Sequence, residues 1–285
     1  MITSRVRWSA AVAAAGITAI TGVGSTAAQA QPSTRSSALV IKVAEQNNAF
    51  TVSPSKTFQA GRVTIAFTAA KGDHTIQIVR LHKGYSMAKF RADAKNGIDQ
   101  GANLSAIHRL DHRVTWLGGA DSIGGKVATF STMLTPGTYY AIDQDGGAHA
   151  TLTVTGPIAS RPAVPTSVTV TGNGNEQWVS PSTLPADGWV KLRNTANQPH
   201  FLVLQRVKES TTGADVTAYI KSGSERNPPW ALKASTGSGV FSPHTATALH
   251  LQMPAGKYVI ACFWPDEMTG QPHFAMGMWK LVTLS

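Results

Sequence analysis

Short stretches rich in valine, isoleucine, threonine and aromatic residues recur along most of the chain, separated by clusters of glycine, proline, asparagine and serine. This pattern is typical of all-β domains, in which short strands are joined by tight turns. The clearest stretches are 38–43, 61–68, 74–81 and 138–142. We therefore expect a β-sandwich architecture.

Apolar residues change to helical spacing in a few places. Within 86–95, Met87, Phe90 and Ala94 recur three to four positions apart, as on one face of a helix. A similar segment, 213–221, occupies the corresponding place later in the chain, and 102–112 is a third candidate. We expect these helices to be short insertions between strands.

The chain also repeats itself. Val-Ser-Pro-Ser occurs at 52–55 and again at 179–182, and the segments that begin at His74 and at His200 match in the same order. Trp116 then aligns with Trp230, and a Gly-x-Tyr motif at 137–139 aligns with one at 256–258. The repeat predicts two tandem sandwiches at 38–156 and 166–285. Three prolines mark 157–165 as the linker between them.

Residues 1–30 have the features of a secretory signal peptide. Arg5 and Arg7 precede a weakly apolar run that ends at Val23, and Ala28-Gln29-Ala30 is a small-residue cleavage pattern. We expect cleavage after Ala30 and export of the remaining chain. No second hydrophobic span follows, so we do not expect the processed protein to span a membrane.

The charge balance narrows the classes of partner. Lysine and arginine number 25 against 15 aspartate and glutamate, a formal charge of +10, yet only 14% of residues are charged. Basic runs of the kind that bind nucleic acid are missing from the sequence, so we exclude a nucleic-acid partner. The excess positive charge is compatible with loose attraction to an anionic cell-envelope surface.

Cys262 is the single cysteine of the chain and therefore has no intramolecular disulfide partner. For an exported protein, three explanations stay open: burial as a small apolar residue, an intermolecular disulfide, or a metal. In the first repeat Asp143 occupies the equivalent position.

The second repeat differs from the first in the segment that follows Cys262. Gly137 to Val154 spans 17 residues, whereas Gly256 to Leu284 spans 28, and the added residues fall within 262–273. His200, Cys262, His273 and Met278 then provide two imidazoles, a thiolate and a thioether. A His2Cys set with a weak axial methionine is the ligand set of electron-transfer copper. Met276 competes with Met278 for the axial place.

In these features the sequence resembles the cupredoxins, the family of plastocyanin and azurin. The resemblance implies two Greek-key β-sandwich domains with short helical insertions. It also implies one type 1-like copper held by His200, Cys262, His273 and Met278. Electron transfer with an unknown redox partner, or copper handling, would be the function. The Cys-to-His loop is longer than in small cupredoxins and closer to that of copper nitrite reductases.

No motif that we recognise in the sequence points to an enzyme activity. The sequence has no paired H-x-H motifs of multicopper oxidases, no G-x-S-x-G and no Walker loop. We interpret His108 and His112 as two exposed histidines, because no carboxylate or third histidine follows at ligand spacing. His149 is interpreted as non-ligating, and 266–267 as a solvated loop tip. The alternative function is a metal-free sandwich pair that acts as a binding or adhesion module at the cell envelope.

Overall fold

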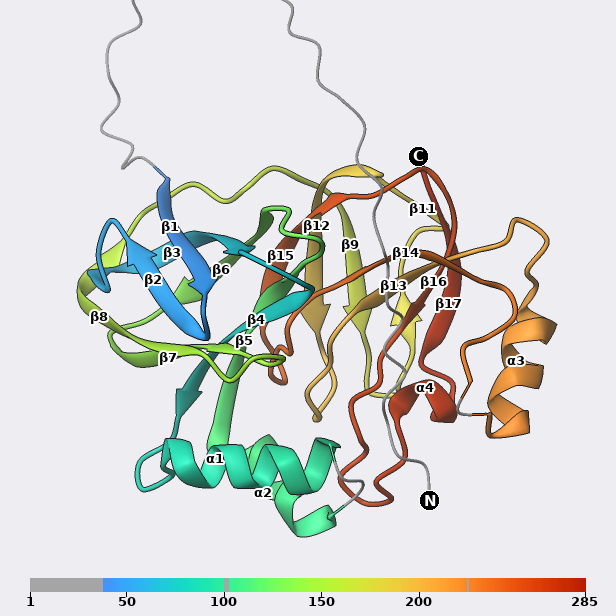
Figure 1. Cartoon of the computed structure of the whole chain (residues 1–285), viewed down its shortest axis with the longest axis horizontal. Coiled ribbons are helices and arrows are strands. Elements are labelled where there is room, and N and C mark those ends of the chain that lie inside the picture. The colour runs from blue at the N-terminus through green and yellow to red at the C-terminus, as the bar shows by residue number, and fades with distance from the viewer. Residues whose placement is uncertain (1–37, 100–102, 225) are drawn as a thin grey trace, which may run out of the picture.

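The computed structural model describes residues 38–99, 103–224 and 226–285. The predicted signal peptide, 1–30, lies outside the described residues. Figure 1 shows two β-rich halves side by side, with helices at their margins. Strands dominate both halves, which confirms the all-β, tandem-sandwich prediction.

The first half is a sandwich whose two sheets share one long strand. One sheet has the order β2-β1-β3-β6, and the other has the order β3-β8-β7-β4-β5. Buried residues alternate along the strands, for example Ile41 and Val43 on β1, as expected of strands with one face in the core. The strands are β1 Leu39–Gln46, β2 Ala49–Ser53, β3 Thr57–Ala69, β4 His74–Leu81, β5 Val114–Ser122, β6 Ala128–Leu134, β7 Gly137–Asp143 and β8 His149–Ala159.

The second half has the same strand order. Its sheets run β10-β9-β12-β15 and β11-β17-β16-β13-β14, with parallel and antiparallel pairs in equivalent places. The strands are β9 Thr166–Gly172, β10 Trp178–Val179, β11 Thr183–Leu184, β12 Asp187–Asn194, β13 Val203–Val207, β14 Ala231–Gly237, β15 Ala246–Gln252, β16 Gly256–Ala261 and β17 Trp279–Leu284. An origin by duplication stays a prediction that this shared topology supports.

A glycine marks the change of sheet in each half. β3 leaves one sheet for the other at Gly61, and the corresponding break between β11 and β12 is followed by Gly188. Both have positive φ angles, 128° and 152°, which disfavour any side chain. At Gly61 an added Cβ would also lie 2.7 Å from the Ala159 carbonyl oxygen. Glycine therefore allows the strand to bend between sheets.

The predicted helical insertions are present. α1 is Met87–Ala94, capped by the Ser86 side chain, and α3 is Gly213–Ser222, which begins with a capping box between Thr212 and Asp215. α2 is Leu104–Arg113, η1 is Lys95–Asp99 and α4 is His273–Met276. Figure 1 places α1 and α2 together at one end of the molecule and α3 at the margin of the second half.

The predicted linker, 157–165, begins later than expected, because β8 continues through Ala159. Past Val154 this strand pairs with β3 alone, and an edge position tolerates Pro157, which has no N–H to donate. The Arg161 guanidinium then donates to the carbonyl oxygens of Gln59 and Ala60, which holds the chain against β3.

The two halves are joined by main-chain and side-chain bonds. β15 pairs antiparallel with β6, so one sheet of each half becomes part of a continuous sheet. The buried Gln77 side chain donates to the Gly118 and Val240 carbonyls and accepts from the Val240 N–H at 2.6 Å. Among the described residues no helix is long and apolar enough to cross a lipid bilayer.

Candidate metal centre

His200 is held at the start of the segment that leads into β13. Its N–H and carbonyl pair with the main chain of Phe241, at 3.2 and 2.8 Å. The Asn194 side chain donates to the carbonyls of Gln198 and Phe241, which fixes the turn before the histidine. These bonds orient the fully buried imidazole toward the end of β16.

Cys262 follows β16, and the inserted loop returns to it. The Cys262 N–H donates to the Met278 carbonyl at 3.2 Å, and the Met278 N–H donates to the His273 carbonyl at 2.9 Å. His273 begins the short helix α4, and its own N–H bonds to the Trp264 carbonyl. The main chain therefore brings all three predicted ligands of this segment together.

The donor atoms of the two histidines and the cysteine converge. The Nδ1 atoms of His200 and His273 are 3.1 Å apart, and the Cys262 Sγ lies 3.8 Å from the first and 3.7 Å from the second. All three side chains are fully buried. Around one ion with ligands at about 2.05 Å (nitrogen) and about 2.3 Å (sulfur), these separations correspond to N–metal–S angles near ~120° and an N–metal–N angle of about 100°. The residues present therefore fit a near-trigonal metal ion.

His200 is not explained by an ordinary structural role in the core. The Nε2 of His200 is buried and has no hydrogen-bond partner in the described part of the chain. Its Nδ1 faces only another imidazole and a thiol. Buried polar groups normally find partners, so an ion between the two Nδ1 atoms and the thiol accounts for their convergence better than packing does.

Burial keeps the donor groups neutral. It lowers the pKa of His200 to about 3, with His273 adding to the effect, and it lowers the pKa of His273 to about 4. Burial also raises the pKa of the Cys262 thiol to about 12. Both imidazoles are therefore unprotonated and able to bind a metal, and the thiol would release its proton when it does.

The structure separates the two methionines that compete for the axial place. Met276 is 41% exposed on α4, whereas Met278 is fully buried. A Cβ added at Gly172 would lie 2.7 Å from the His200 ring and 3.0 Å from the Met278 Cε, so the two side chains lie over the same glycine. This supports Met278, rather than Met276, as the axial candidate. It also adds Gly172 as a residue that makes room for the site.

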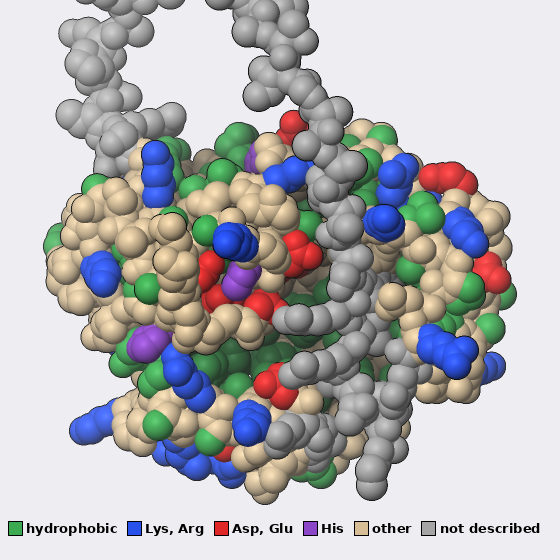
Figure 2. Space-filling model, viewed as in Figure 1, with side chains coloured by type: hydrophobic (Ala, Val, Ile, Leu, Met, Phe, Trp, Pro, Cys, Tyr) green, Lys and Arg blue, Asp and Glu red, His purple; other side chains and the backbone are tan. Residues whose placement is uncertain are grey.

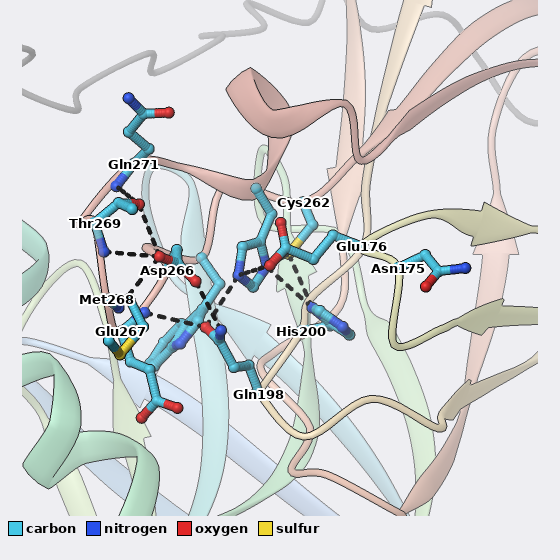
Figure 3. A network of polar contacts seen from close by, with 12 residues as sticks. Asn175, Glu176, Gln198, His200, Cys262, Asp266, Glu267, Met268, Thr269 and Gln271 are labelled. Carbon is cyan, nitrogen blue, oxygen red and sulfur yellow. Dashed lines mark hydrogen bonds and ion pairs between the residues drawn. The ribbon is translucent and has the colours of Figure 1, made fainter.

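Gln198 supports the centre and was not found from the sequence. Its Oε1 lies 3.2 Å from His273 Nε2, and its Nε2 donates to Asp266 at 2.7 Å. Figure 3 shows Gln198 between the inserted loop and the metal centre. Glu176 Oε1 lies 4.0 Å from the same histidine nitrogen. A partner of this kind fixes the orientation of a ligating imidazole.

The interpretation of 266–267 as a solvated loop tip is wrong for Asp266, which is 4% exposed. Its Oδ1 accepts from the Thr269 N–H and hydroxyl and from the Met268 N–H. Burial alone would raise the pKa of this carboxyl, but the bonds from Gln198, Thr269 and Met268 outweigh it and lower the pKa. The carboxylate therefore organises the loop from inside.

The first half carries a different pair at the equivalent place. His74 Nδ1 bonds to Asp143 Oδ2 at 2.8 Å, where the second half has His200 and Cys262. Asp143 lies on β7 opposite Ile76. In the second half Ala261 pairs with Val203, so Cys262, the next residue, comes opposite Leu202, in agreement with the sequence alignment. Here the histidine has a carboxylate partner, so it is satisfied without a metal. His149 bonds to Arg91 on the surface.

Comparison with known proteins gives matches at the level of fold. No protein-family model and no curated protein matches the chain. Among solved structures, it is similar to auracyanin A, a "blue" copper protein from Chloroflexus aurantiacus, with 17% identity over 41% of this chain and 98% of that one and a TM-score of 0.29.

Two-domain copper proteins match over more of the chain. A copper nitrite reductase from Nitrosomonas europaea is 11% identical over 88% of this chain and 94% of that one, with a TM-score of 0.23. A multicopper oxidase is 13% identical over 88% of this chain and 90% of that one, with a TM-score of 0.24. All of these TM-scores are below 0.5, so the tandem-sandwich assignment rests on the strand order of the two halves and not on these matches. These values carry no argument about the site, which rests on its own geometry.

Proposed function

We propose that this protein binds one copper ion through His200, Cys262, His273 and Met278 and uses it for electron transfer or copper handling. The single observation that carries the proposal is the convergence of two imidazole Nδ1 atoms and one thiol within 3.1 to 3.8 Å, fully buried. Soft sulfur ligands favour Cu(I), and imidazole serves both oxidation states, so the set suits an ion that changes charge.

The chain's own residues set the properties of the site. Copper, when bound, supplies a one-electron redox couple. Cys262 would provide a thiolate, His200 and His273 two imidazoles, and Met278 a weaker thioether ligand. The Oε1 of Gln198 holds the His273 ring by its contact with the Nε2 of that ring. Burial of every candidate ligand excludes water from the site, which favours rapid electron transfer.

A redox partner would approach from the cleft between the halves. This cleft, of about 870 Å³, is lined by Phe263, Trp264 and Phe274, the chain neighbours of Cys262 and His273. Figure 2 shows a hollow with acidic side chains and a histidine along one wall and apolar side chains below them. The same cleft favours a second candidate function, the binding of a small apolar or cationic ligand without copper.

Metal analysis and visible spectroscopy of the full chain test the copper proposal. We expect one buried copper and an intense thiolate-to-copper band. Cys262→Ser should abolish the band and leave the fold intact, because the side chains have nearly the same size. Met278→Leu should alter the spectrum less than His273→Ala, since an axial thioether is a weak ligand.

A full chain that binds no copper at Cys262, with the same spectrum before and after Cys262→Ser, would contradict the proposal. Titration of that copper-free chain with a cationic aromatic dye would then test the cleft. Binding that Ala275→Trp blocks would favour the second candidate function, because Ala275 is exposed and lines the cleft.

We propose in addition that the protein works outside the cytoplasm, after cleavage following Ala30. The basic start, the apolar run and the Ala-Gln-Ala ending support this. N-terminal sequencing of exported protein should begin at Gln31. An intact Met1 on a membrane-embedded product would contradict the proposal.

A further inference from the structure

A second cluster of metal-binding side chains lies where α2 meets the inserted loop. His108 and His112 are exposed on α2, one turn apart, with ring centroids 4.2 Å from each other. The Glu267 carboxylate of the loop lies 3.1 Å from His112 Nε2. One ligand atom from each of the three residues lies within 4.8 Å of the others. Both histidines are exposed, as predicted, but the Glu267 carboxylate, 155 positions away in the sequence, lies beside them.

These three side chains offer donor atoms of intermediate hardness, neither soft sulfur nor oxygen alone. Two imidazoles at i and i+4 share one helix face, and a carboxylate oxygen completes a face of three donors. Such N2O sets suit Cu2+ and Zn2+. Ligands around one ion of this size lie about 3.4 Å from each other. Exposed side chains, such as His112 at 54%, can rotate to close the remaining gap.

The surroundings favour a cation at this position. Asp111, next to His112 in the chain, has a buried Oδ2 with no hydrogen-bond partner in the described residues, and its Oδ1 accepts from Trp264. The cluster also lies in the last turns of α2, where the helix dipole is negative. A bound cation would be attracted by the Glu267 carboxylate and by the negative end of the helix.

We propose that His108, His112 and Glu267 form a second, surface metal site that takes a first-row divalent cation, Cu2+ in preference to Zn2+. The order follows the general affinity series for nitrogen and oxygen ligands. Solvent supplies the remaining ligands, because both histidines are exposed. The site has no thiolate, so copper there has no intense visible band and is distinguishable from copper at Cys262.

The surface site is connected to the buried centre by a short chain of contacts. The Glu267 N–H donates to Gln198 Oε1 at 3.1 Å, and the same oxygen lies 3.2 Å from His273 Nε2. An ion at Glu267 would therefore hold one end of the loop that supplies the buried ligands. This connection rests on the proposed copper function, whereas metal binding at the surface does not.

Titration of the full chain with Cu2+, followed by calorimetry and electron paramagnetic resonance, tests the site. We expect a second equivalent of Cu2+ whose resonance shows nitrogen and oxygen ligands and which leaves the visible band unchanged. The same equivalent should persist in Cys262→Ser, so that failure of the buried site does not hide it. Zn2+ should displace it only at higher concentration.

Two variants and a control decide the assignment. His108→Ala and Glu267→Gln should each weaken the second equivalent by roughly tenfold or more, as loss of one of three ligands implies. His149→Ala, which removes another exposed histidine, should change nothing. The proposal is overturned if no second equivalent binds, or if both variants bind it as tightly as the unchanged chain.

Discussion

At the residue scale, the candidate metal centre depends on a position that has no side chain. Gly172 ends β9 directly beneath the His200 ring and Met278. It does not have a positive φ angle, so the backbone does not require glycine there. Glycine is required there for lack of space, because the side chains of His200, Met278 and Trp178 occupy the volume that a Cβ would need.

Gly172→Ala should therefore damage the site without unfolding the protein. A methyl group 2.7 Å from the His200 ring must displace that ligand, and we expect copper affinity to fall by on the order of tenfold. Copper titration, followed by the visible band, measures this. Gly174→Ala is the matched control, since a Cβ there meets nothing within 4 Å. Equal affinities for the two variants would contradict the role of Gly172.

The candidate ligands could be chosen from the sequence, but the residues that support them could not. Cysteine, histidine and methionine are rare enough that their spacing carries information, which led to His273 and Met278. Glycine and glutamine are common, so nothing in the sequence marks Gly172 or Gln198. Glu267 was missed for another reason: its partners are on a helix of the other half.

At the scale of elements, the inserted loop 262–273 is held by its own carboxylate. Asp266 N–H donates to the Gln271 carbonyl, and the Gly270 N–H returns to the Asp266 carbonyl, while the side chain binds Thr269 and Gln198. The loop is thus an ordered part of the site, although its residues are mainly irregular in structure. Its length, which exceeds that of the first repeat, therefore does not imply a loose metal centre.

Asp266→Ala should loosen this loop. Three donors of residues 268–269 and the Gln198 amide would lose their acceptor, each loss costing about 1 kcal/mol. We expect faster proteolytic cleavage within 262–273 and a broadened or shifted copper band. Met268→Ala, in a side chain that is 76% exposed, should leave both readouts unchanged. Unaltered cleavage in Asp266→Ala would show that the loop is held by other contacts.

Strands and helices were predicted well where local sequence signals determine their ends, and less well where contacts between distant segments of the chain determine them. The helix predicted at 213–221 is observed at Gly213–Ser222, because its capping box is local. The pattern did not predict that β8 continues through 157–159, the first residues of the expected linker, because this pairing with β3 joins segments about a hundred positions apart. The tryptophan alignment was also wrong: Trp116 packs against Trp264 in the main core, whereas Trp230 lies in a separate cluster.

At the scale of the whole molecule, strand pairing and hydrogen bonds join the two halves, in addition to the chain between them. The Gln77 side chain of the first half accepts a hydrogen bond from the buried Val240 N–H of the second, and Trp116 and Ser242 exchange two further bonds. Gly119 and Gly239 approach so closely that a Cβ on the second would lie 2.6 Å from the nitrogen of the first. The halves are thus in direct backbone contact.

We expect one cooperative unfolding transition for both halves. Separation would expose buried backbone groups at the junction, each at a cost of about 1–3 kcal/mol. Differential scanning calorimetry of the full chain, without metal, should show a single peak whose calorimetric and van't Hoff enthalpies agree. Gln77→Met, which keeps the volume and removes the bonds, should lower the midpoint. Two resolved peaks in the unchanged chain would contradict this expectation.

The pairing of β6 with β15 also bears on how the protein behaves when it is crowded among its own copies. Each strand forms the edge of its own half-sheet, and an unpaired edge is a template on which strands of other molecules can add. Because β6 and β15 pair with each other, their main-chain N–H and C=O groups are not free to pair with a strand of another molecule. Joining the halves in this way protects the protein from edge-to-edge aggregation, an advantage that two separately folded copies of the same sandwich would lack.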